Sequence, residues 1–439
     1  MTKKVHIKTF GCEMNQYDSN KIAELLKEKN SFIKTNIEEE ADLIVFNTCS
    51  IREKAEDKVY SELGKLQRLK NKNPDLKIAV GGCVASQEGE KIIKKAPYVN
   101  FVFGPQTLHR LPELISKEKL SGKSQVDITF PTIEKFDSLS KPSASGISAS
   151  VSIMEGCSKY CSFCVVPYTR GEEISRSLDS ILQEVIELTQ QGVIEINLLG
   201  QNVNAYRSLN NDGIEIDFAD LIEYISQVDE VKRIRFTTSH PNEMNDNLIE
   251  CFANNKKLAK FIHLPIQSGS DKVLMGMKRN YTFLEYKSII KKLQKACPGI
   301  CVSSDFIIGF PGETVADHNK TIKAIKEIFF DYSYSFIYSP RPGTPAAYLD
   351  DDTSQDDKKA RLAEIQKILL EQGSANTKKM IGSIQRVLFD QLDQEDNTFK
   401  GKSDNNRIIK VKTQQNILNQ MLNVQVSSFD GKYLHGEIV

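Results

Sequence analysis

Cys157-Ser158-Lys159-Tyr160-Cys161-Ser162-Phe163-Cys164 is the stretch around which this chain of 439 residues is organised. Three thiols at the spacing C-x3-C-x2-C can hold three irons of a four-iron cluster, which leaves the fourth iron open for a small molecule. The alternatives are a zinc knuckle or inert buried thiols. A zinc site would need a fourth ligand nearby, and the nearest histidines, His109 and His240, lie far along the chain. The spacing therefore predicts an open, catalytic iron–sulfur cluster.

The segment around this motif alternates strand and helix patterns over residues 149–372, and a polar helix is expected over residues 356–372. Helical patterns separate most of the expected strands, which gives six strand–helix units and not eight. This count predicts a partial barrel that is open on one side. The expected strands cover residues 151–154, 195–199, 233–237, 261–264, 302–308 and 332–338.

Residues 1–120 also alternate strand and helix, which predicts an α/β domain with a doubly wound parallel sheet. Its expected strands cover 5–9, 43–47, 78–81 and 101–103, and its expected helices cover 15–28, 53–69 and 87–95. Residues 121–148 are expected to form a linker, because Ser140-Lys141-Pro142-Ser143-Ala144-Ser145-Gly146 cannot hold a regular element well. Residues 376–439 predict a small all-β barrel with strands at 385–389, 408–411, 423–426 and 433–438.

A second set of thiols, Cys12, Cys49 and Cys83, follows three of the strands expected in the first domain. The carboxyl ends of parallel strands share one edge, so these cysteines are expected to converge. Each also precedes a helix, whose N-terminal dipole favours a thiolate. Three buried structural cysteines are the alternative. The placement predicts a second three-cysteine cluster, whereas Cys251, Cys297 and Cys301 are expected to be buried free thiols.

The composition is that of a globular protein, with 40% hydrophobic and 26% charged residues. No apolar run is long enough to span a membrane, and the N-terminus reads as a strand and not as a signal peptide, so a cytoplasmic location is expected. Nine cysteines, an odd number, do not form a disulfide framework. The formal net charge of zero neither supports nor excludes a nucleic-acid partner.

Several polar and glycine-rich positions at strand ends are candidates for binding a small cofactor. One candidate turn is Gly309-Phe310-Pro311-Gly312, where glycines permit close backbone approach, although an ordinary turn is the alternative. Another is Gly200-Gln201-Asn202, for which a capping role is equally open. Arg233 and Arg235 would share one face of a strand and hold a carboxylate or phosphate, or else be solvated. His240 is either a substrate contact or a hydrogen-bonded loop residue.

These motifs together resemble the radical S-adenosylmethionine methylthiotransferases, and within that family the MiaB branch, the tRNA-2-methylthio-N6-dimethylallyladenosine synthases. The resemblance covers essentially the whole chain. The stretches that carry it, besides the motif at 157–164, are Gly11-Cys12-Glu13-Met14-Asn15, Asn47-Thr48-Cys49-Ser50-Ile51-Arg52-Glu53-Lys54-Ala55, Gly82-Cys83-Val84-Ala85-Ser86-Gln87, Cys164-Val165-Val166-Pro167-Tyr168-Thr169-Arg170-Gly171 and Gly200-Gln201-Asn202-Val203-Asn204-Ala205-Tyr206.

The resemblance implies two 4Fe–4S clusters, one on Cys157, Cys161 and Cys164 that binds S-adenosylmethionine and one on Cys12, Cys49 and Cys83 that carries sulfur. It implies methylthiolation of carbon 2 of N6-dimethylallyladenosine at position 37 of tRNA, by a radical reaction, with no catalytic residue assigned beyond the clusters. The implied partners are tRNA and an electron donor that the sequence does not name, with no membrane, and a monomer is expected. A TRAM domain that binds RNA is implied for residues 376–439.

Basic residues of the last domain are expected to contact phosphates if they gather on one face; randomly solvated side chains are the alternative. These residues are Lys378, Lys379, Arg386, Lys400, Lys402, Arg407, Lys410 and Lys412. Two rival functions stay open at this point. One keeps the reaction but places it on a ribosomal protein side chain or on another tRNA adenosine, and the other is a non-catalytic iron–sulfur protein that binds RNA.

Overall fold

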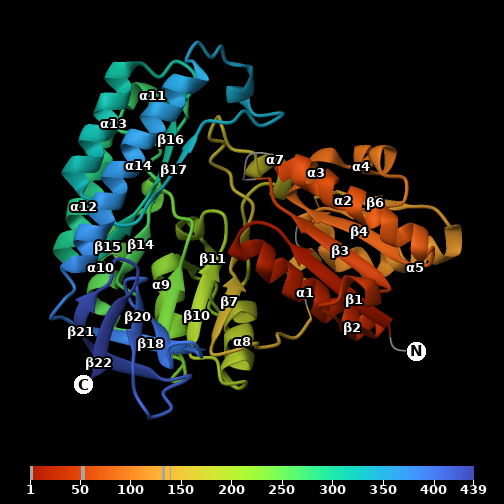
Figure 1. Ribbon diagram of the computed structural model, residues 1–439, viewed down its shortest axis with the longest axis horizontal. Coiled ribbons are helices and arrows are strands. Elements are labelled where there is room, and N and C mark those ends of the chain that lie inside the picture. The colour runs from red at the N-terminus through yellow and green to blue at the C-terminus, as the bar shows by residue number, and fades with distance from the viewer. Residues whose placement is uncertain (1–2, 51–54, 131–133, 139) are drawn as a thin grey trace.

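The computed structural model describes residues 3–50, 55–130, 134–138 and 140–439. Three parts follow one another along the chain, as Figure 1 shows: an N-terminal sheet with its helices, a central barrel-like core, and a small C-terminal barrel below the core. Among the described residues no helix is long and apolar enough to cross a membrane.

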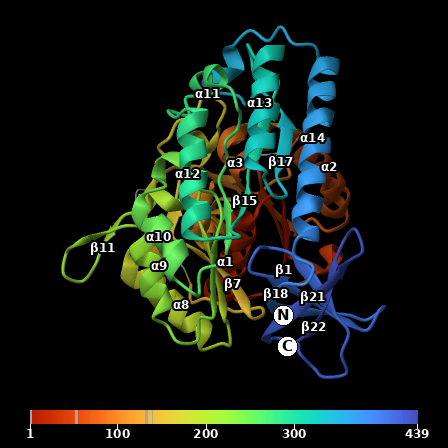
Figure 2. The ribbon, with the colours of Figure 1, turned by 90° about the vertical axis from the view of Figure 1, so that its left-hand side faces the viewer.

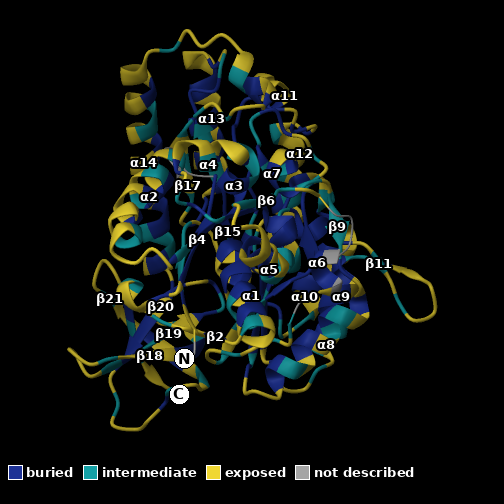
Figure 3. Ribbon diagram, turned by 90° about the vertical axis from the view of Figure 1, so that its right-hand side faces the viewer, coloured by how far each residue is buried: buried dark blue, intermediate teal, exposed yellow. Residues whose placement is uncertain are grey.

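The N-terminal part is one parallel sheet of six strands in the order β2-β1-β3-β4-β5-β6. Its apolar side chains separate into two layers, one under α1 and α5 and one under α2, α3 and α4, which confirms the doubly wound fold. Figure 3 shows the outer faces of these helices exposed. The elements are β1 Lys3–Thr9, α1 Glu13–Asn30, β2 Phe32–Lys34, β3 Leu43–Thr48, α2 Ala55–Lys72, β4 Lys77–Gly82, α3 Cys83–Glu88, α4 Glu90–Lys95, β5 Phe101–Phe103, α5 Leu111–Ser121 and β6 Gln125–Asp127.

The order of these strands creates a switch point between β1 and β3, since β2 continues outward from β1 while β4 to β6 continue on the other side of β3. In open parallel sheets, ligands bind at such a point beyond the carboxyl ends of the strands. The ends of β1, β3 and β4 are therefore the place where a ligand of this domain is expected.

The central core is a barrel that is open on one side, as the six predicted strand–helix units indicate; β15 and β16 together occupy one of the six strand positions. Three short sheets build its wall: β13-β10-β7, β14-β15 and β16-β17, all with parallel pairing. The strands are β7 Ser148–Ser152, β10 Glu195–Leu199, β13 Arg233–Phe236, β14 Phe261–His263, β15 Cys301–Ser303, β16 Asp305–Ile308 and β17 Tyr334–Ile337. The expected strand at 302–308 is thus two strands that pair with different neighbours.

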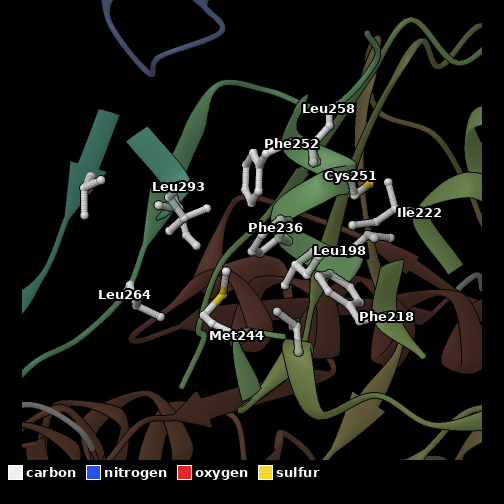
Figure 4. Close-up of a cluster of buried hydrophobic side chains, with 14 of the residues drawn as sticks. Leu198, Phe218, Ile222, Phe236, Met244, Cys251, Phe252, Leu258, Leu264 and Leu293 are labelled. Atoms are coloured by element: carbon white, nitrogen blue, oxygen red, sulfur yellow. The ribbon is translucent and has the colours of Figure 1, made fainter. Parts of the chain in front are cut away.

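Helices cover the outside of this wall and bury a continuous apolar layer against it. They are α8 Leu178–Thr189, α9 Phe218–Ser226, α10 Asp246–Asn254, α11 Asp271–Gly276, α12 Phe283–Ala296, α13 Val315–Ile328 and α14 Gln355–Lys378. Figure 4 shows Cys251 among Phe252, Leu258 and Ile222 in this layer. Cys251 and Cys297 are buried free thiols as expected, whereas Cys301 is only partly buried.

The C-terminal part is a closed barrel of five strands in the order β18-β19-β20-β22-β21. Closure leaves no free strand edge, and a compact apolar cluster fills the interior. The strands are β18 Ile384–Asp393, β19 Thr398–Ser403, β20 Ile408–Val411, β21 Met421–Phe429 and β22 Leu434–Ile438. Figure 2 shows this barrel beside the lower end of α14.

Several boundaries differ from the expectation. β6 pairs with β5, so the N-terminal domain extends past residue 121 into the expected linker. The strands β2 and β19 are not among the expected strands; β2 has only three residues, and β19 contains two lysines, a glycine and a serine, a composition typical of a loop. The predicted helix at 87–95 is divided by Gly89, which has a positive φ of 52°. Residue 53, where the second helix was expected to begin, lies outside the described residues.

Candidate functional site

The core cysteines lie on the loop between β8 Met154–Glu155 and α7 Val166–Arg170, at the carboxyl end of the first barrel strand. Gly156 has a φ of 76°, and a Cβ there would collide with the backbone oxygen of Glu172. Only glycine fits this turn into the loop. The loop is closed by hydrogen bonds from the Cys157 amide to the Gly171 oxygen, 3.2 Å, and from the Cys164 amide to the Cys161 oxygen, 3.0 Å.

The predicted turn Gly200-Gln201-Asn202 reaches this loop from the end of β10. The Gln201 side chain accepts a hydrogen bond from the Gly156 amide, 2.5 Å, and the Asn202 amide donates to Glu173, 3.2 Å. A Cβ on Gly200 would collide with Met154. These residues therefore lie beside the cysteine loop and hold it, while cofactor contact stays a prediction.

The second predicted turn, Gly309-Phe310-Pro311-Gly312, directly follows β16, at the carboxyl end of that barrel strand. Gly309 and Gly312 have positive φ values of 67° and 79°. Phe310 is buried and packs edge-on against Tyr338, in a cluster that Phe163 of the cysteine loop joins. The turn therefore packs beside the cysteine loop, and its contact with a cofactor also stays a prediction.

Arg279 is a residue of this site that no sequence pattern indicated. Its guanidinium is buried and donates to the Cys161 sulfur at 3.4 Å, to the Tyr281 hydroxyl at 2.9 Å and to the Pro265 oxygen at 2.8 Å. Among the described residues no carboxylate forms an ion pair with it. An isolated buried cation is costly, so a negative charge at Cys161 is its natural counter-charge. Burial alone would lower the pKa of Arg279, but Tyr281 and Cys161 raise it.

His240 lies close to Arg279 and is buried at the end of β13. Its Nδ1 accepts a hydrogen bond from the Asn242 amide at 3.2 Å, and its ring contacts Tyr281 edge-on, with 5.8 Å between centroids. Its Nε2 has no hydrogen-bond partner among the described residues. Burial first, and then the charge of Arg279, lowers the pKa of His240 to about 2. The ring is therefore neutral at ordinary pH.

Cys12, Cys49 and Cys83 lie at the ends of β1, β3 and β4, the edge at which the switch point is found. Gly11 has a φ of 112°, and a Cβ on it would lie 2.7 Å from the Cys49 sulfur. Contact with Cys49 lowers the pKa of Cys12 to about 6, against the effect of burial. The expected convergence is thus present for Cys12 and Cys49. Residues 51–54 of the motif after Cys49 lie outside the described residues.

Arg170 connects the two sets of cysteines. It ends α7, the helix that follows Cys164, and donates to Asn15 at 3.3 Å and to Asp18 at 2.9 Å in α1. Burial would lower its pKa, but Glu155, then Cys83, Asp18 and Cys12 raise it. Arg170, six residues after Cys164, therefore lies within electrostatic range of Cys12 and Cys83.

The described residues include no group of three His, Cys, Asp or Glu already placed as a metal site. The donor types nevertheless fit iron: six thiols in two sets of three, with glycine at Gly11 and Gly156 where a side chain would not fit. Burial raises the pKa of Cys157 to about 11 and that of Cys164 to about 12. These two thiols are protonated at neutral pH without a metal and must release protons when they bind one.

Arg233 and Arg235 do not lie at this site, which corrects their assignment to cofactor binding. They begin β13, at the end of the barrel opposite the cysteine loop, and both pair with Glu195. Arg233 also donates to the Lys402 oxygen at 2.9 Å, and Arg235 to the Asp404 oxygen at 3.1 Å. The two arginines are far from the cysteine loop because that loop lies at the carboxyl end of the barrel strands, whereas the amino end of β13 faces the C-terminal barrel.

The basic residues of the C-terminal barrel do not all face outward. Arg386 pairs with Asp404, and Arg407 pairs with Asp331 of the core, while Lys400 and Lys410 pair with Asp393. Arg386 also donates to the Lys256 oxygen of the core at 3.0 Å, so Arg386 and Arg407 dock the barrel onto the core and are not displayed to phosphates. The remaining lysines, Lys378, Lys379, Lys402 and Lys412, remain candidates.

Comparison with known proteins agrees with this arrangement. The profile of the radical SAM superfamily matches residues 151–325, and that of the uncharacterized protein family UPF0004 matches residues 4–104. Among solved structures, the radical S-adenosylmethionine methyltransferase TsrM from Kitasatospora setae aligns with a TM-score of 0.57 at 13% identity, over 79% of this chain and 75% of its own. The cobalamin-dependent radical enzyme OxsB aligns with a TM-score of 0.55 at 13% identity, over 84% of this chain and 56% of its own. At that identity both support the fold alone.

Full-length relatives are much closer in sequence. The tRNA-2-methylthio-N(6)-dimethylallyladenosine synthase of Methylobacillus flagellatus is 56% identical over 100% of both chains. The enzymes of that name from Chromobacterium violaceum and Neisseria gonorrhoeae are 56% and 54% identical, over 99% and 100% of this chain and 98% and 99% of their own. With its two cysteine sets and its three domains in the same chain, this protein belongs to the tRNA-2-methylthio-N(6)-dimethylallyladenosine synthase family.

Proposed function

We propose that this protein adds a methylthio group to carbon 2 of N6-dimethylallyladenosine at position 37 of tRNA. The observation that carries the proposal is the identity of 56% with an enzyme named for this product over the whole length of both chains. The radical SAM domain supports the mechanism, because carbon 2 of adenine holds an unactivated C–H bond that acid–base groups cannot break.

The cofactors are two 4Fe–4S clusters and S-adenosylmethionine. Cys157, Cys161 and Cys164 would hold the cluster of the core, and Cys12, Cys49 and Cys83 the auxiliary cluster. When bound, these groups supply a carbon-centred radical from S-adenosylmethionine and the sulfur that enters the product. The chain's own residues orient the site: Arg279 donates to the Cys161 sulfur, and Gln201 holds the backbone at Gly156.

The partners and the location extend the proposal. tRNA is the substrate, and an electron donor must reduce the core cluster before each cleavage. We propose that the enzyme acts as a monomer in the cytoplasm, where its substrate is found. The C-terminal barrel is proposed to be the TRAM domain that binds the RNA, and its exposed lysine Lys412 is a candidate phosphate contact.

The test is mass spectrometry of nucleosides from N6-dimethylallyladenosine-containing tRNA, after anaerobic incubation with reconstituted enzyme, S-adenosylmethionine and a reductant. A methylthio adduct on that nucleoside is expected. If 5′-deoxyadenosine forms but no adduct appears, the radical chemistry is retained and the substrate is wrong. If a ribosomal protein side chain gains the sulfur, the assignment to tRNA is wrong, and if neither product forms, a non-catalytic iron–sulfur protein is favoured.

Substitution of the two cysteine sets separates their roles. Replacing Cys12, Cys49 or Cys83 with Ala is expected to leave S-adenosylmethionine cleavage intact and to abolish sulfur insertion. Replacing Cys157, Cys161 or Cys164 with Ala is expected to abolish cleavage itself. Normal cleavage by both groups of variants would contradict this division.

A further inference from the structure

Two aromatic side chains of β17, Tyr334 and Phe336, are exposed although they belong to a barrel strand. Their exposed fractions are 63% and 53%. Their rings are nearly parallel, with an angle of 10° between planes and 6.5 Å between centroids. Single exposed apolar residues are common on protein surfaces, but a stacked aromatic pair on a barrel strand is unusual and indicates a binding surface.

The pair faces the inside of the barrel and not the surrounding helices. In the parallel pairing of β16 with β17, Tyr334 lies beside Asp305 and Phe336 beside Ile307, so these four share one face. The alternate residues of β16, Phe306 and Ile308, belong to the apolar layer under the outer helices. The interior of a closed barrel is filled by side chains, whereas here both rings on the inner face are more than half exposed.

His263 of β14 extends this surface. Its ring meets Tyr334 edge-on with 6.3 Å between centroids, its Nδ1 lies 2.8 Å from the Ser303 hydroxyl, and its Nε2 lies 3.4 Å from the Asp305 carboxylate. These contacts fix the imidazole beside the stacked pair. We call Tyr334, Phe336 and His263 the aromatic platform.

The platform lies between the C-terminal barrel and the cysteine loop. Asp331, three residues before Tyr334, pairs with Arg407 of the C-terminal barrel. In the other direction, Tyr338, two residues after Phe336, packs with Phe310 in the cluster that Phe163 of the cysteine loop joins. A ligand on the platform would therefore lie between the C-terminal domain and the cysteine loop.

A polar cavity of about 150 Å³ lies farther along the same inner wall. Phe261, on the same face of β14 as His263, lines it together with Arg235. The C-terminal barrel contributes Lys402, and the N-terminal domain contributes Glu13, the neighbour of Cys12. Glu195, the ion-pair partner of Arg235, also lines the cavity, so it is polar without an excess of either charge. A polar cavity beside an aromatic surface, with contributions from all three domains, suits a ligand that carries both aromatic bases and polar groups.

We propose that the aromatic platform binds an unpaired base of the RNA substrate by stacking, next to the adenosine that is modified. The proposal rests on the proposed function. Single-stranded RNA loops are recognised through unstacked bases that lie on aromatic side chains, with cations along the backbone. The adenine of S-adenosylmethionine has the same ring chemistry, but the extension of the platform toward the C-terminal barrel favours the RNA.

The test uses reconstituted full-length enzyme and an anticodon stem-loop that carries N6-dimethylallyladenosine, with the fluorescent base 2-aminopurine at an adjacent loop position. The double variant Tyr334→Leu, Phe336→Leu removes both rings while keeping exposed apolar side chains. Tyr334→Phe with Phe336→Tyr keeps the rings. Leu284→Ala on α12, at a residue 74% exposed, is the matched control for loss of exposed apolar surface.

The Leu double variant is expected to bind the stem-loop about 10-fold more weakly, since base–aromatic stacking contributes about 5- to 150-fold per base. It is also expected to lose the quenching of 2-aminopurine, while the ring-keeping variant and the control match the wild type. S-adenosylmethionine affinity and RNA-independent 5′-deoxyadenosine formation should not change.

Equal RNA affinity and quenching in the Leu variant would overturn the proposal. Loss of S-adenosylmethionine binding instead, with RNA binding unchanged, would assign the platform to the cofactor and also overturn it. Failure of the proposed function is distinguishable, because then the wild type itself forms no methylthio product from the tRNA, whatever the variants bind.

Discussion

At the scale of single residues, the buried charge of Arg279 indicates that the Cys161 sulfur beside it carries negative charge. A guanidinium that reaches a cysteine sulfur and no carboxylate among the described residues is balanced only when that sulfur carries negative charge. Hydrogen bonds to the sulfurs of an iron–sulfur cluster raise its reduction potential, because they stabilise the more negative, reduced form. With the proposed cluster on Cys157, Cys161 and Cys164, Arg279 would act as a positioning residue that donates to one of its ligands.

Replacing Arg279 with Met is expected to lower the reduction potential of the core cluster and to reduce iron retention, while Arg279→Lys gives an intermediate effect. A hydrogen bond to a charged group contributes about 1.5–3 kcal/mol. The potential is measured by a redox titration followed by electron paramagnetic resonance. An unchanged potential in the Met variant would show that Arg279 has only a structural role.

His240 predicts a pH dependence of stability. Its pKa in the folded state, about 2, lies below the value of about 6.5 in the unfolded chain. The unfolded state therefore binds more protons below pH 6.5, and the free energy of unfolding falls as the pH falls from there. Between pH 6.5 and 5.5 the loss is about 1 kcal/mol.

Urea unfolding of metal-free protein at several pH values measures this loss. The variant His240→Gln should show a flatter pH dependence than the wild type. His435→Gln, at a histidine beside Asp430 on the surface, is the control and should not flatten it in this way. Equal slopes for His240→Gln and the wild type would rule out His240 as the source.

At the scale of elements, the turns from strand to helix decide where the cysteines lie. The sequence predicted the strands β1, β3 and β4 and the cysteines at their ends, because apolar runs followed by glycine and cysteine are local patterns. It did not predict that Arg233 and Arg235 face another domain, nor that Arg279 reaches Cys161, since both depend on contacts between residues more than 100 positions apart. Periodicity identifies the face of a strand, but not the domain that covers it.

Gly11→Ala is expected to remove the auxiliary cluster and leave the core cluster. The new Cβ would collide with Cys49, and the positive φ adds strain of about 1–3 kcal/mol. Iron content after reconstitution should fall from about eight to about four atoms per chain, with S-adenosylmethionine cleavage retained.

Gly122→Ala is the matched control, because Gly122 has a φ of 66° at the end of α5 and open space around it. It should keep the full iron content. Equal iron content in Gly11→Ala would show that the collision is relieved by a small movement of the turn.

At the scale of the whole molecule, buried ion pairs hold the three domains together. Glu195 pairs with Arg233 and Arg235, which in turn bind backbone oxygens of the C-terminal barrel. Removing one member of a buried ion pair costs about 3–5 kcal/mol, because a charge is left without its partner. These contacts hold the C-terminal barrel at a fixed position against the amino ends of the core strands.

Arg235→Met is expected to loosen the C-terminal barrel. Limited proteolysis should cut between α14 and β18 faster than in the wild type, and tRNA methylthiolation should fall while S-adenosylmethionine cleavage without RNA is retained. Arg386→Met removes a more exposed ion pair with Asp404 and should have a smaller effect. Unchanged proteolysis in Arg235→Met would mean that the remaining contacts are sufficient for docking.

The buried group between the N-terminal domain and the core has a further consequence for how this chain can vary. Lys135 and Arg170 each pair with both Asp18 and Glu155, and all four side chains are almost inaccessible to water. Two positive and two negative charges sum to zero, so any single neutral substitution leaves an odd buried charge. Substitutions at these positions are therefore tolerated mainly when one acidic and one basic residue are replaced together. The four residues, which link two domains, are expected to change as a group and not one at a time.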